Sequence, residues 1–317
     1  MIDDIKKFLG ADWTKYHQVF EDNLKSNIEL LDSINEYLLF RKGKQLRPML
    51  CLLAAKACGG ISNNAILCAA AIEMLHTATL LHDDVVDEAD TRRGNPTIVS
   101  LYTPQASVLI GDYWLSRAIH TIIQDCDKAV FQSFARSIED LSRGEIIQMD
   151  KAKKMDTTFD DYRQIIALKT ASVFQTAVFS GSYCSGANSE ELQAFDNYAY
   201  HLGLAFQMRD DILDYHPESI TGKPSGQDIK EKKITLPLLS ALSKSSAAES
   251  IQVKQLIVSG QVQPVVEFVY SKKGLYDAQT ILQQESLLAV EALNVIDDSP
   301  AKKYLCELAS QLNIREM

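Results

Sequence analysis

The sequence predicts an all-helical protein. Its 317 residues include only 14 glycines and 8 prolines, whereas folds built of many short strands need frequent turns. Apolar residues recur at spacings of three and four along most of the chain, which is the period of one helix face. No run alternates strictly between apolar and polar residues, and no tandem repeat stands out. With 46% hydrophobic residues, a chain of this length can bury a large core.

The expected helices follow one another from the N-terminal region to the C-terminus. The first strongly periodic stretch is 18–40, after which RKGKQLRP breaks the pattern. CGGISNN reads as a turn, and DTRRGNPT and PESITGKPSGQD are loops because they are rich in polar residues, Gly and Pro. Further helices are expected at about 48–58, 64–88, 105–124, 128–150, 159–184, 189–215 and from ITLPLLSALSK through the remainder to 317.

A DDxxD motif occurs twice, each time within an apolar helical stretch. The six aspartates are Asp83, Asp84, Asp87, Asp210, Asp211 and Asp214. In each motif the first and last carboxylates lie one turn apart on the same helix face. Three like charges beside Leu, Val and Ile would destabilise a helix unless a cation neutralises them. Carboxylates suit Mg²⁺, which takes one or two of them together with water and substrate phosphates.

The two motifs therefore indicate two carboxylate walls around one cluster of ions. No linker-like stretch separates them, and both would have to face the same ligand. Sites in helical bundles are built from side chains on facing helices. Although the length of the chain nominally suggests two domains, we expect residues 1–317 to form a single all-helical domain.

Basic residues lie near both motifs. Separate Lys and Arg clusters, beside carboxylates and Mg²⁺, are what binding of a multiply charged diphosphate requires. The segment GKQLRP enters a helix at Pro48, where free backbone N–H groups also favour an anion. The basic residues concerned are Lys44, Arg47, Arg92, Arg93, Lys223, Lys232 and Lys233.

Each of these features has an ordinary structural interpretation. A single DDxxD is more often a solvated helix face, and GKQLRP alone is an ordinary loop before a helix. His76 on an apolar helix is usually a core histidine, and Lys232 and Lys233 are usually surface charges. Two motifs flanked by apolar residues and three basic segments, taken together, favour the functional interpretation.

Charge and cysteine content narrow the class of protein. A net charge of −10 argues against general nucleic-acid binding, which needs an excess of Lys and Arg. The six cysteines form no CxxC pair, which favours free thiols in a reducing compartment over disulfides or zinc. The N-terminus has no apolar signal-like region, and no run reaches 18 uncharged apolar residues. We therefore expect a cytoplasmic protein with no transmembrane segment.

Four motifs in order, GKQLRP, LLHDDVVDEADTRRG, FQMRDDILDY and GKPSGQDIKEKKITLPL, resemble those of the trans-isoprenyl diphosphate synthases, the polyprenyl synthetase family. The match runs from about residue 40 to 240. The resemblance implies a single-domain bundle of long antiparallel helices around a central cavity, and a homodimer. It also implies a reaction in which isopentenyl diphosphate elongates an allylic diphosphate head to tail with Mg²⁺.

The resemblance further assigns metal ligands by position. Asp83 and Asp87 resemble the ligands of the first motif, with Asp84 supporting them. Asp210 resembles the direct ligand of the second motif, whose remaining aspartates, Asp211 and Asp214, act directly or through water. Three magnesium ions per site are expected when diphosphate is bound.

Substrate-binding residues are assigned in the same way. Isopentenyl diphosphate is expected at Lys44, Arg47, His76 and Arg93. The allylic diphosphate is expected at Arg92, Lys169, Lys223 and Lys233. Thr170 and Gln207 resemble polar residues that line the place where the allylic cation forms, so they join Lys169 as expected catalytic residues. The family usually has Gly-Lys where this chain has Lys232-Lys233, which leaves open which lysine reaches phosphate.

Residues before the first motif are expected to limit product length. Met74, Leu75 and Ala78 lie nine, eight and five positions before Asp83, along roughly one side of the helix. One isoprene unit is of the same order as the helix pitch of ~5.4 Å, so these residues could act as a ruler. In the family, a bulky aromatic at the Ala78 position gives short products, and alanine leaves the cavity open. The chain thus resembles medium- and long-chain enzymes such as octaprenyl diphosphate synthases, with a product longer than C20.

Four alternatives remain. A shorter-chain farnesyl or geranylgeranyl diphosphate synthase shares the same motifs. A class I terpene cyclase also ionises diphosphates but usually carries an Asn/Ser/Glu triad in place of the second aspartate motif. A non-catalytic partner subunit of a heteromeric synthase tends to lose aspartates or basic residues that are present here. A phosphohydrolase using His82 and Asp83 lacks the other spaced His and Asp ligands.

Overall fold

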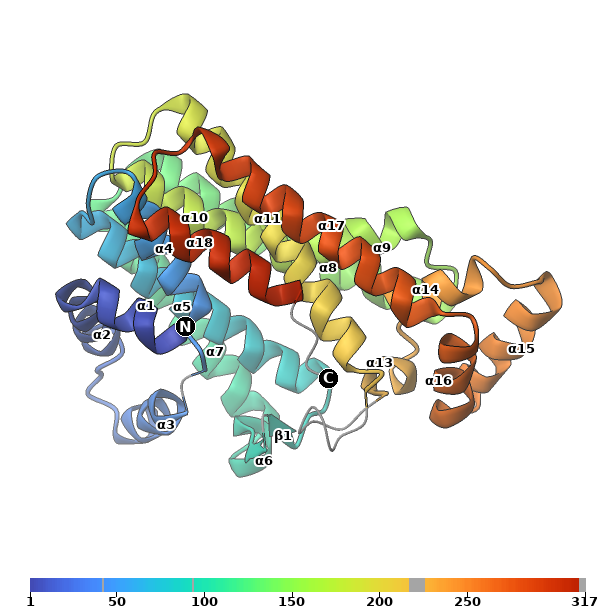
Figure 1. The fold of residues 1–317 in the computed structure, drawn as a ribbon. Helices are drawn as coiled ribbons and strands as arrows, with labels where there is room; N and C mark the ends of the chain where they lie inside the picture. Colours follow the sequence, from blue (N-terminus) through green and yellow to red (C-terminus); the bar gives the residue numbers. More distant parts are fainter. Residues whose placement is uncertain (42, 93, 217–225, 314–317) are drawn as a thin grey trace. The chain divides into compact units, whose positions relative to one another are not determined.

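The computed structural model describes residues 1–41, 43–92, 94–216 and 226–313, and this part of the chain is helical almost throughout (Figure 1). The sheet found within these residues has two short strands, β1 (Thr91–Arg92) and β2 (Asn95–Pro96), which pair antiparallel. The all-helical prediction is confirmed. Contacts between residues divide the chain into two compact units.

Unit 1 contains residues 1–136, 173–196 and 294–305. Its centre is α5, which packs along α7 and also against α4 and α2. The elements that lie wholly or partly in unit 1 are α1 (Ile2–Leu9), α2 (Ala11–Asp22), α3 (Glu29–Phe40), α4 (Leu46–Ala57), α5 (Asn63–Val86), α6 (Ile98–Leu101), α7 (Pro104–Asp125), α8 (Lys128–Lys154), α10 (Ser172–Cys184), α11 (Ser189–Leu213), η2 (Leu293–Val295) and α18 (Pro300–Ser310).

The sequence of α5 explains its central place. Ser62 caps the helix by accepting a hydrogen bond from the backbone N–H of Ala65, which satisfies one of the free donors at a helix start. The helix is apolar on nearly all sides, the pattern of a buried helix, and its small residues Ala69, Ala70 and Ala71 are fully buried. Small side chains let neighbouring helices approach closely, so α5 can be enclosed by several of them.

Helix α5 is also the one helix in the described ranges that is long and apolar enough to cross a membrane. About two thirds of its most apolar window, 67%, is buried inside the protein. A core helix of a globular protein meets the same criteria of length and composition.

The periodic stretch 18–40 does not form one helix, so this part of the sequence prediction is wrong. Helix α2 ends at Asp22 and α3 begins at Glu29. Side chains satisfy the backbone groups that the break leaves open: Asp32 accepts a hydrogen bond from the N–H of Ser26, and Asn35 donates one to the carbonyl of Leu24. Polar groups that periodicity does not register therefore stabilise a turn between two helices.

Unit 2 contains residues 137–172, 197–293 and, in its described part, 306–313. Its helix α14 packs against α17, α16 and α9. The elements found only here are α9 (Phe159–Ile166), the π-helical turn η1 (Ala167–Ala171), α13 (Gln227–Lys230), α14 (Leu236–Leu242), α15 (Ala247–Val258), α16 (Val262–Ser271), α17 (Gly274–Ala292) and η3 (Gln311–Asn313). The later parts of α8 and α11 and the end of α18 also belong to it.

Two features of unit 2 determine where the expected catalytic residues lie. The helix predicted over 159–184 is interrupted by the π-helical turn η1, which carries Lys169 and Thr170. Such wide turns occur mostly as single insertions in α-helices and are frequent at functional sites. At Gly203 of α11, a Cβ atom would lie 2.5 Å from the Cα of Ala171. The missing side chain therefore allows α11 to pack directly on the wide turn.

Candidate active site

The first aspartate motif ends α5 in unit 1. Asp84 is buried, and the Nε of Arg92 donates a hydrogen bond of 2.6 Å to its carboxylate. Burial raises the pKa of Asp84, and the positive charge of Arg92 opposes that effect. Asp87 is exposed and Asp83 half-buried. The structure thus shows that an arginine of the same unit holds Asp84, the supporting member of the motif.

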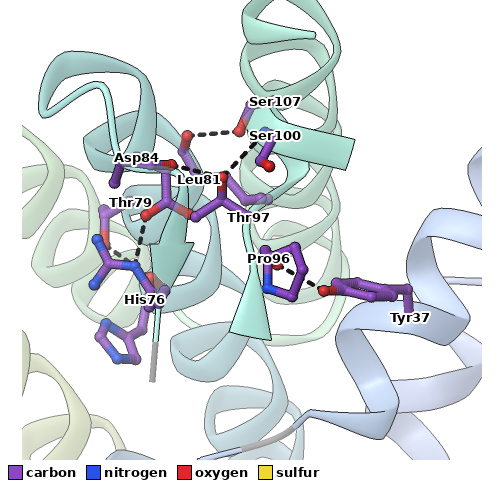
Figure 2. A network of polar contacts seen from close by, with 11 residues as sticks. Tyr37, His76, Thr79, Leu81, Asp84, Pro96, Thr97, Ser100 and Ser107 are labelled. Atoms are coloured by element: carbon purple, nitrogen blue, oxygen red, sulfur yellow. Dashed lines mark hydrogen bonds and ion pairs between the residues drawn. The ribbon is translucent and has the colours of Figure 1, made fainter. Parts of the chain in front are cut away.

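Hydrogen bonds fix the loop that brings Arg92 to Asp84. Figure 2 shows Thr97 and Tyr37 among the residues of this polar network. Thr97 donates to the carbonyl of Ala89 at 2.6 Å, and the hydroxyl of Tyr37 donates to the carbonyl of Pro96 at 2.6 Å. The loop is thereby tied to the end of α5 and to α3. Arg93, expected to bind isopentenyl diphosphate, lies outside the described residues.

The segment GKQLRP enters α4 through a left-handed residue. Gln45 has φ 54° and is buried, and its side chain donates a 2.8 Å hydrogen bond to the hydroxyl of Tyr16 on α2. This contact fixes the backbone between the exposed Lys44 and the partly buried Arg47. The guanidinium of Arg47 lies 5.0 Å from the ring centroid of Phe174, a distance at which a cation is attracted to an aromatic face.

The remaining expected residues of unit 1 lie on α5. His76 is half-buried, and its backbone carbonyl accepts a 2.8 Å hydrogen bond from Thr79 (Figure 2). Met74, Leu75 and Ala78 are buried to 1% exposure or less. A larger side chain at Ala78 would therefore enter a packed interior.

The second aspartate motif lies at the end of α11 in unit 2, and its central member is the most enclosed. Asp211 is buried and accepts hydrogen bonds from the hydroxyl of Tyr162 at 2.7 Å and from the side-chain amide of Gln207 at 2.8 Å. Burial raises the pKa of Asp211 to about 7, although both hydrogen bonds act in the opposite direction. Thr170 in turn donates to the side-chain oxygen of Gln207 at 2.8 Å. A continuous chain of hydrogen bonds thus joins the wide turn to the motif.

The other two aspartates of this motif differ from Asp211. Asp210 is exposed. Asp214 accepts hydrogen bonds of 3.0 Å from the backbone N–H groups of Gln227 and Asp228, where α13 begins. Burial raises the pKa of Asp214, and these backbone donors oppose the rise. Asp214 therefore also anchors the segment that follows the loop. Lys223 of that loop lies outside the described residues.

A cavity of about 120 Å³ in unit 2 brings several expected residues together. Pockets that enclose a whole ligand usually measure about 300–1,000 Å³, so this cavity is large enough for only part of a substrate. Lys169 is paired with Glu145, and Lys233 is paired with Glu231. The polar residues that line the cavity are Gln148, Lys151, Thr157, Tyr162, Lys169, Thr170, Gln207, Asp211, Asp228, Lys233 and Thr235.

The pair Lys232-Lys233 is divided by its backbone geometry. Lys233 lines the cavity, whereas Lys232 is exposed and has φ 59°. That left-handed conformation is one that glycine adopts without steric cost. Lys232 therefore occupies the position at which the family that this sequence resembles usually carries glycine, and the backbone there adopts a conformation that suits glycine.

The donor set fits a hard divalent cation. The groups that both motifs offer are carboxylate oxygens, and Mg²⁺ takes one or two of these together with waters and substrate phosphates. Among the residues that the structure describes, no three His, Cys, Asp or Glu side chains are grouped so as to hold an ion by themselves.

Tyr162 and Asp228 are among the cavity residues that were not predicted from the sequence. Tyr162 lies seven and eight positions before Lys169 and Thr170, a spacing of two helical turns that could have revealed it. Asp228 lies in the motif GKPSGQD and was passed over in favour of its lysine. Burial and the neighbouring charges of Asp211 and Asp214 raise the pKa of Asp228 well above its usual value. Tyr162 contacts Asp211, and the backbone N–H of Asp228 contacts Asp214, so both residues contact the second aspartate motif.

Comparison with known families decides the classification. The model of the polyprenyl synthetase family matches residues 28–271. The chain belongs to the polyprenyl synthetase family. It is an enzyme of the trans-isoprenyl diphosphate synthase type and transfers prenyl groups.

Individual members of the polyprenyl synthetase family resemble the whole chain. The octaprenyl diphosphate synthase of Haemophilus influenzae is 33% identical over 97% of this chain and 95% of its own length. A short chain isoprenyl diphosphate synthase of Methanothermobacter thermautotrophicus is 31% identical over 95% of this chain and 97% of its own. Similarity thus extends to relatives named for products of different length.

Solved structures of the same family resemble the fold. A decaprenyl diphosphate synthase from Rhodobacter capsulatus has a TM-score of 0.93 at 31% identity and covers 99% of this chain and 98% of its own. A polyprenyl synthase from Caulobacter crescentus CB15, solved with calcium and isoprenyl diphosphate, has a TM-score of 0.93 at 29% identity. It covers 100% of this chain and 98% of its own.

Proposed function

We propose that this enzyme condenses isopentenyl diphosphate with an allylic diphosphate in a Mg²⁺-assisted reaction and releases an all-trans polyprenyl diphosphate longer than C20. The observation that carries the proposal is the cavity at which Lys169, Thr170, Gln207, Asp211 and Lys233 meet. It joins two cations, a buried carboxylate and two neutral polar groups. These groups suit a reaction in which a diphosphate departs and a carbocation develops on the remaining carbon chain.

Substrate diphosphates bind at the basic residues. Lys169 and Lys233, with Arg92 and Lys223, hold the allylic diphosphate as point charges and as a guanidinium fork. Lys44, Arg47, His76 and Arg93 hold isopentenyl diphosphate. The salt bridges of Lys169 with Glu145 and of Lys233 with Glu231 keep both ammonium groups oriented before a substrate enters.

Magnesium ions belong at the aspartate motifs. Asp83, Asp87 and Asp210 act as direct ligands, and Asp84, Asp211 and Asp214 support them directly or through water, with three ions per site when diphosphate is bound. Bound ions neutralise the negative charge that develops on the departing diphosphate. Support comes from the relative solved with calcium and isoprenyl diphosphate and from the hard oxygen donors of both motifs.

Neutral polar groups of the chain stabilise the carbocation. The hydroxyl of Thr170 donates its hydrogen to Gln207, so its oxygen lone pairs can face positive charge. Gln207 in turn donates its amide hydrogen to Asp211, which orients its carbonyl dipole. Apolar helices exclude the water that would quench the cation. The alkene then attacks, a carbon–carbon bond forms and the departing diphosphate takes the released proton, so that no dedicated His or Glu base is needed.

Product length is set on α5. Ala78 has a small side chain, and it lies with Met74 and Leu75 on the helix that ends in the first aspartate motif. A growing apolar chain that follows this helix meets no aromatic side chain at that position. The size of residue 78 therefore favours a long product.

The assembly proposed is a homodimer of single-domain subunits in the cytoplasm. Large apolar side chains at the end of α6 and the start of α7 are exposed, Leu101 to 45% and Leu109 to 67%. A second subunit would cover them in the proposed homodimer. No nucleic acid and no transmembrane segment take part in this proposal.

The test is an elongation assay with purified protein, isopentenyl diphosphate, Mg²⁺ and allylic primers of increasing length, followed by chromatography of the products. Products longer than C20 support the proposal. Products of C15 or C20 alone would assign a short-chain synthase. No elongation with any primer would assign a non-catalytic partner subunit, an alternative opposed by the presence of both aspartate motifs.

A further inference from the structure

Three cysteines that are distant in the sequence meet inside unit 1. The Sγ atom of Cys68 on α5 lies 3.8 Å from that of Cys126, which follows α7, and 3.9 Å from that of Cys184, which ends α10. Both distances are van der Waals contacts between sulfurs, so only small movements separate either pair from bonding distance. We define Cys68, Cys126 and Cys184 as the thiol cluster.

The members of the thiol cluster differ in access to solvent. Cys68 is fully buried, whereas Cys126 and Cys184 are half-buried. Cys126 therefore keeps part of its surface open to a small solute, whereas Cys68, in contact with it, does not. Hydrogen bonds from the thiols of Cys184 and Cys68 lower the pKa of Cys126 below the usual value, which favours its thiolate.

The remaining cysteines do not belong to the thiol cluster. Cys51 is fully buried, and its thiol contacts the backbone carbonyl of Ala65. Cys58 and Cys306 are half-buried and form no disulfide in the described part of the chain. Burial raises the pKa of Cys58 to about 12, so its thiol is a poor nucleophile. These two residues provide natural controls.

We propose that the thiol cluster is an oxidation site at which peroxide converts Cys126 and Cys68 into a reversible disulfide. The half-buried Cys126 reacts first, and the fully buried Cys68 resolves the product because the two sulfurs lie 3.8 Å apart. This order follows the pattern of redox-sensitive cysteines, in which an accessible thiolate lies next to a resolving thiol.

The chemistry balances with one molecule of peroxide. The thiolate of Cys126 attacks one peroxide oxygen, an S–O bond forms, the O–O bond breaks, and the departing hydroxide leaves as water after it takes up a proton. The sulfur of Cys68 then attacks the sulfenic sulfur of Cys126. An S–S bond forms, the S–O bond breaks, and the second hydroxide leaves as water with the proton of Cys68. Two thiols lose two electrons in total, and the peroxide accepts both.

The location gives the disulfide a consequence for the enzyme. Cys68 lies on the helix that also carries Ala78 and ends in the first aspartate motif. A disulfide to Cys126 would link α5 covalently to the end of α7, the helix against which it packs. Oxidation would thereby restrict the motion of α5, the helix that limits product length in the proposed function.

The test treats the full-length protein with a small excess of hydrogen peroxide, blocks remaining thiols under denaturing conditions and maps disulfides by mass spectrometry after trypsin. Trypsin leaves Cys58 and Cys68 on one peptide, 57–92, and Cys126 alone on 118–128. A Cys58→Ser variant therefore removes the ambiguity. We expect loss of two thiols per chain, a link between these two peptides, and full reversal by dithiothreitol.

Variants separate the cluster from general oxidation. Cys126→Ser is expected to abolish the rapid loss of thiols, whereas Cys306→Ser is expected to leave its rate unchanged. Circular dichroism of each variant establishes that it is folded. The proposal is overturned if Cys58 or Cys306 reacts as fast as Cys126, if the product is a link between two chains, or if peroxide leaves Cys68 and Cys126 reduced. Disulfide mapping uses protein in which all three cysteines of the thiol cluster are kept. A variant of the cluster that fails to fold therefore does not prevent the test.

Discussion

The hydroxyl of Tyr162 donates a 2.7 Å hydrogen bond to the carboxylate of Asp211. The bond connects α9 with the second aspartate motif on α11, and both side chains are buried. A buried carboxylate needs such donors to remain charged. Tyr162 therefore has a place in the proposed metal site although no feature of the motif names it.

Replacement of Tyr162 by phenylalanine tests this relationship. Asp211 loses one donor, its pKa rises above about 7, and more of it is protonated at neutral pH. Since a hydrogen bond to a charged group contributes about 1.5–3 kcal/mol, we expect at least a tenfold increase in the Mg²⁺ concentration for half-maximal activity. Tyr198→Phe, at a buried tyrosine outside the cavity lining, is the control. An equal change in both variants would assign Tyr162 a packing role only.

Enlargement of residue 78 tests the proposed ruler. We expect Ala78→Phe to shift the product distribution toward shorter chains, as measured by chromatography of the dephosphorylated products. Ala69→Phe is the matched control, because Ala69 is equally buried on α5 but nine positions away, on the opposite face. Each variant overpacks the interior at a cost of about 1–3 kcal/mol. A product distribution unchanged by Ala78→Phe would refute the ruler.

Separate replacement of the two adjacent lysines tests which of them reaches phosphate. We expect Lys233→Ala to raise the KM for the allylic diphosphate at least tenfold, since Lys233 lines the cavity. Lys232→Gly should leave that KM unchanged. It should also keep or slightly raise the stability, because glycine relieves a left-handed conformation that costs other residues about 1 kcal/mol. A KM that rises only in Lys232→Gly would reverse the assignment.

A buried carboxylate of α17 makes stability dependent on pH. Glu285 accepts hydrogen bonds from Arg163 at 2.6 Å and from His201 at 2.7 Å. Burial raises its pKa, but the bonds from His201 and Arg163 outweigh that effect, so the pKa of Glu285 is lowered from 4.5. A carboxylate with a lowered pKa stabilises the folded protein at any pH above the pKa that it has in the unfolded chain. This contribution is lost as the pH falls through the pKa that it has in the folded protein.

We therefore expect Glu285→Gln to lower the free energy of unfolding at pH 7 by about 1–3 kcal/mol, measured by urea denaturation. The difference from the unsubstituted protein should shrink as pH falls below 4.5. Glu291→Gln, at an exposed position of the same helix, should change stability by less than about 0.5 kcal/mol. A difference that persists at acid pH would mean that packing rather than charge is responsible.

The all-helical fold was predictable because apolar periodicity and the scarcity of turn residues are local signals. The break between α2 and α3 was not, because it depends on Asn35 reaching the carbonyl of Leu24, 11 residues earlier. Spacing can place apolar faces, but it does not show where a polar side chain replaces a backbone partner.

The candidate site divides in the same way. Lys169, Thr170, Gln207 and Lys233, named from resemblance, line one cavity. The pairing of Arg92 with Asp84 and the donor Tyr162 became apparent only in the folded structure. The thiol cluster was hidden for a similar reason. Cys126 and Cys184 lie 58 and 116 positions after Cys68, so only the packing of α5 with neighbouring helices brings the three thiols into contact.

The wide turn at 167–171 also matters for comparing this chain with others. A π-helical turn holds about one residue more than an α-helical turn. Deletion of one residue here would therefore restore an ordinary helix and rotate Lys169 and Thr170 by about 100° relative to α9, away from Glu145 and Gln207. A homologue with a one-residue gap at this point would keep the same letters in its motif and lose their alignment in space.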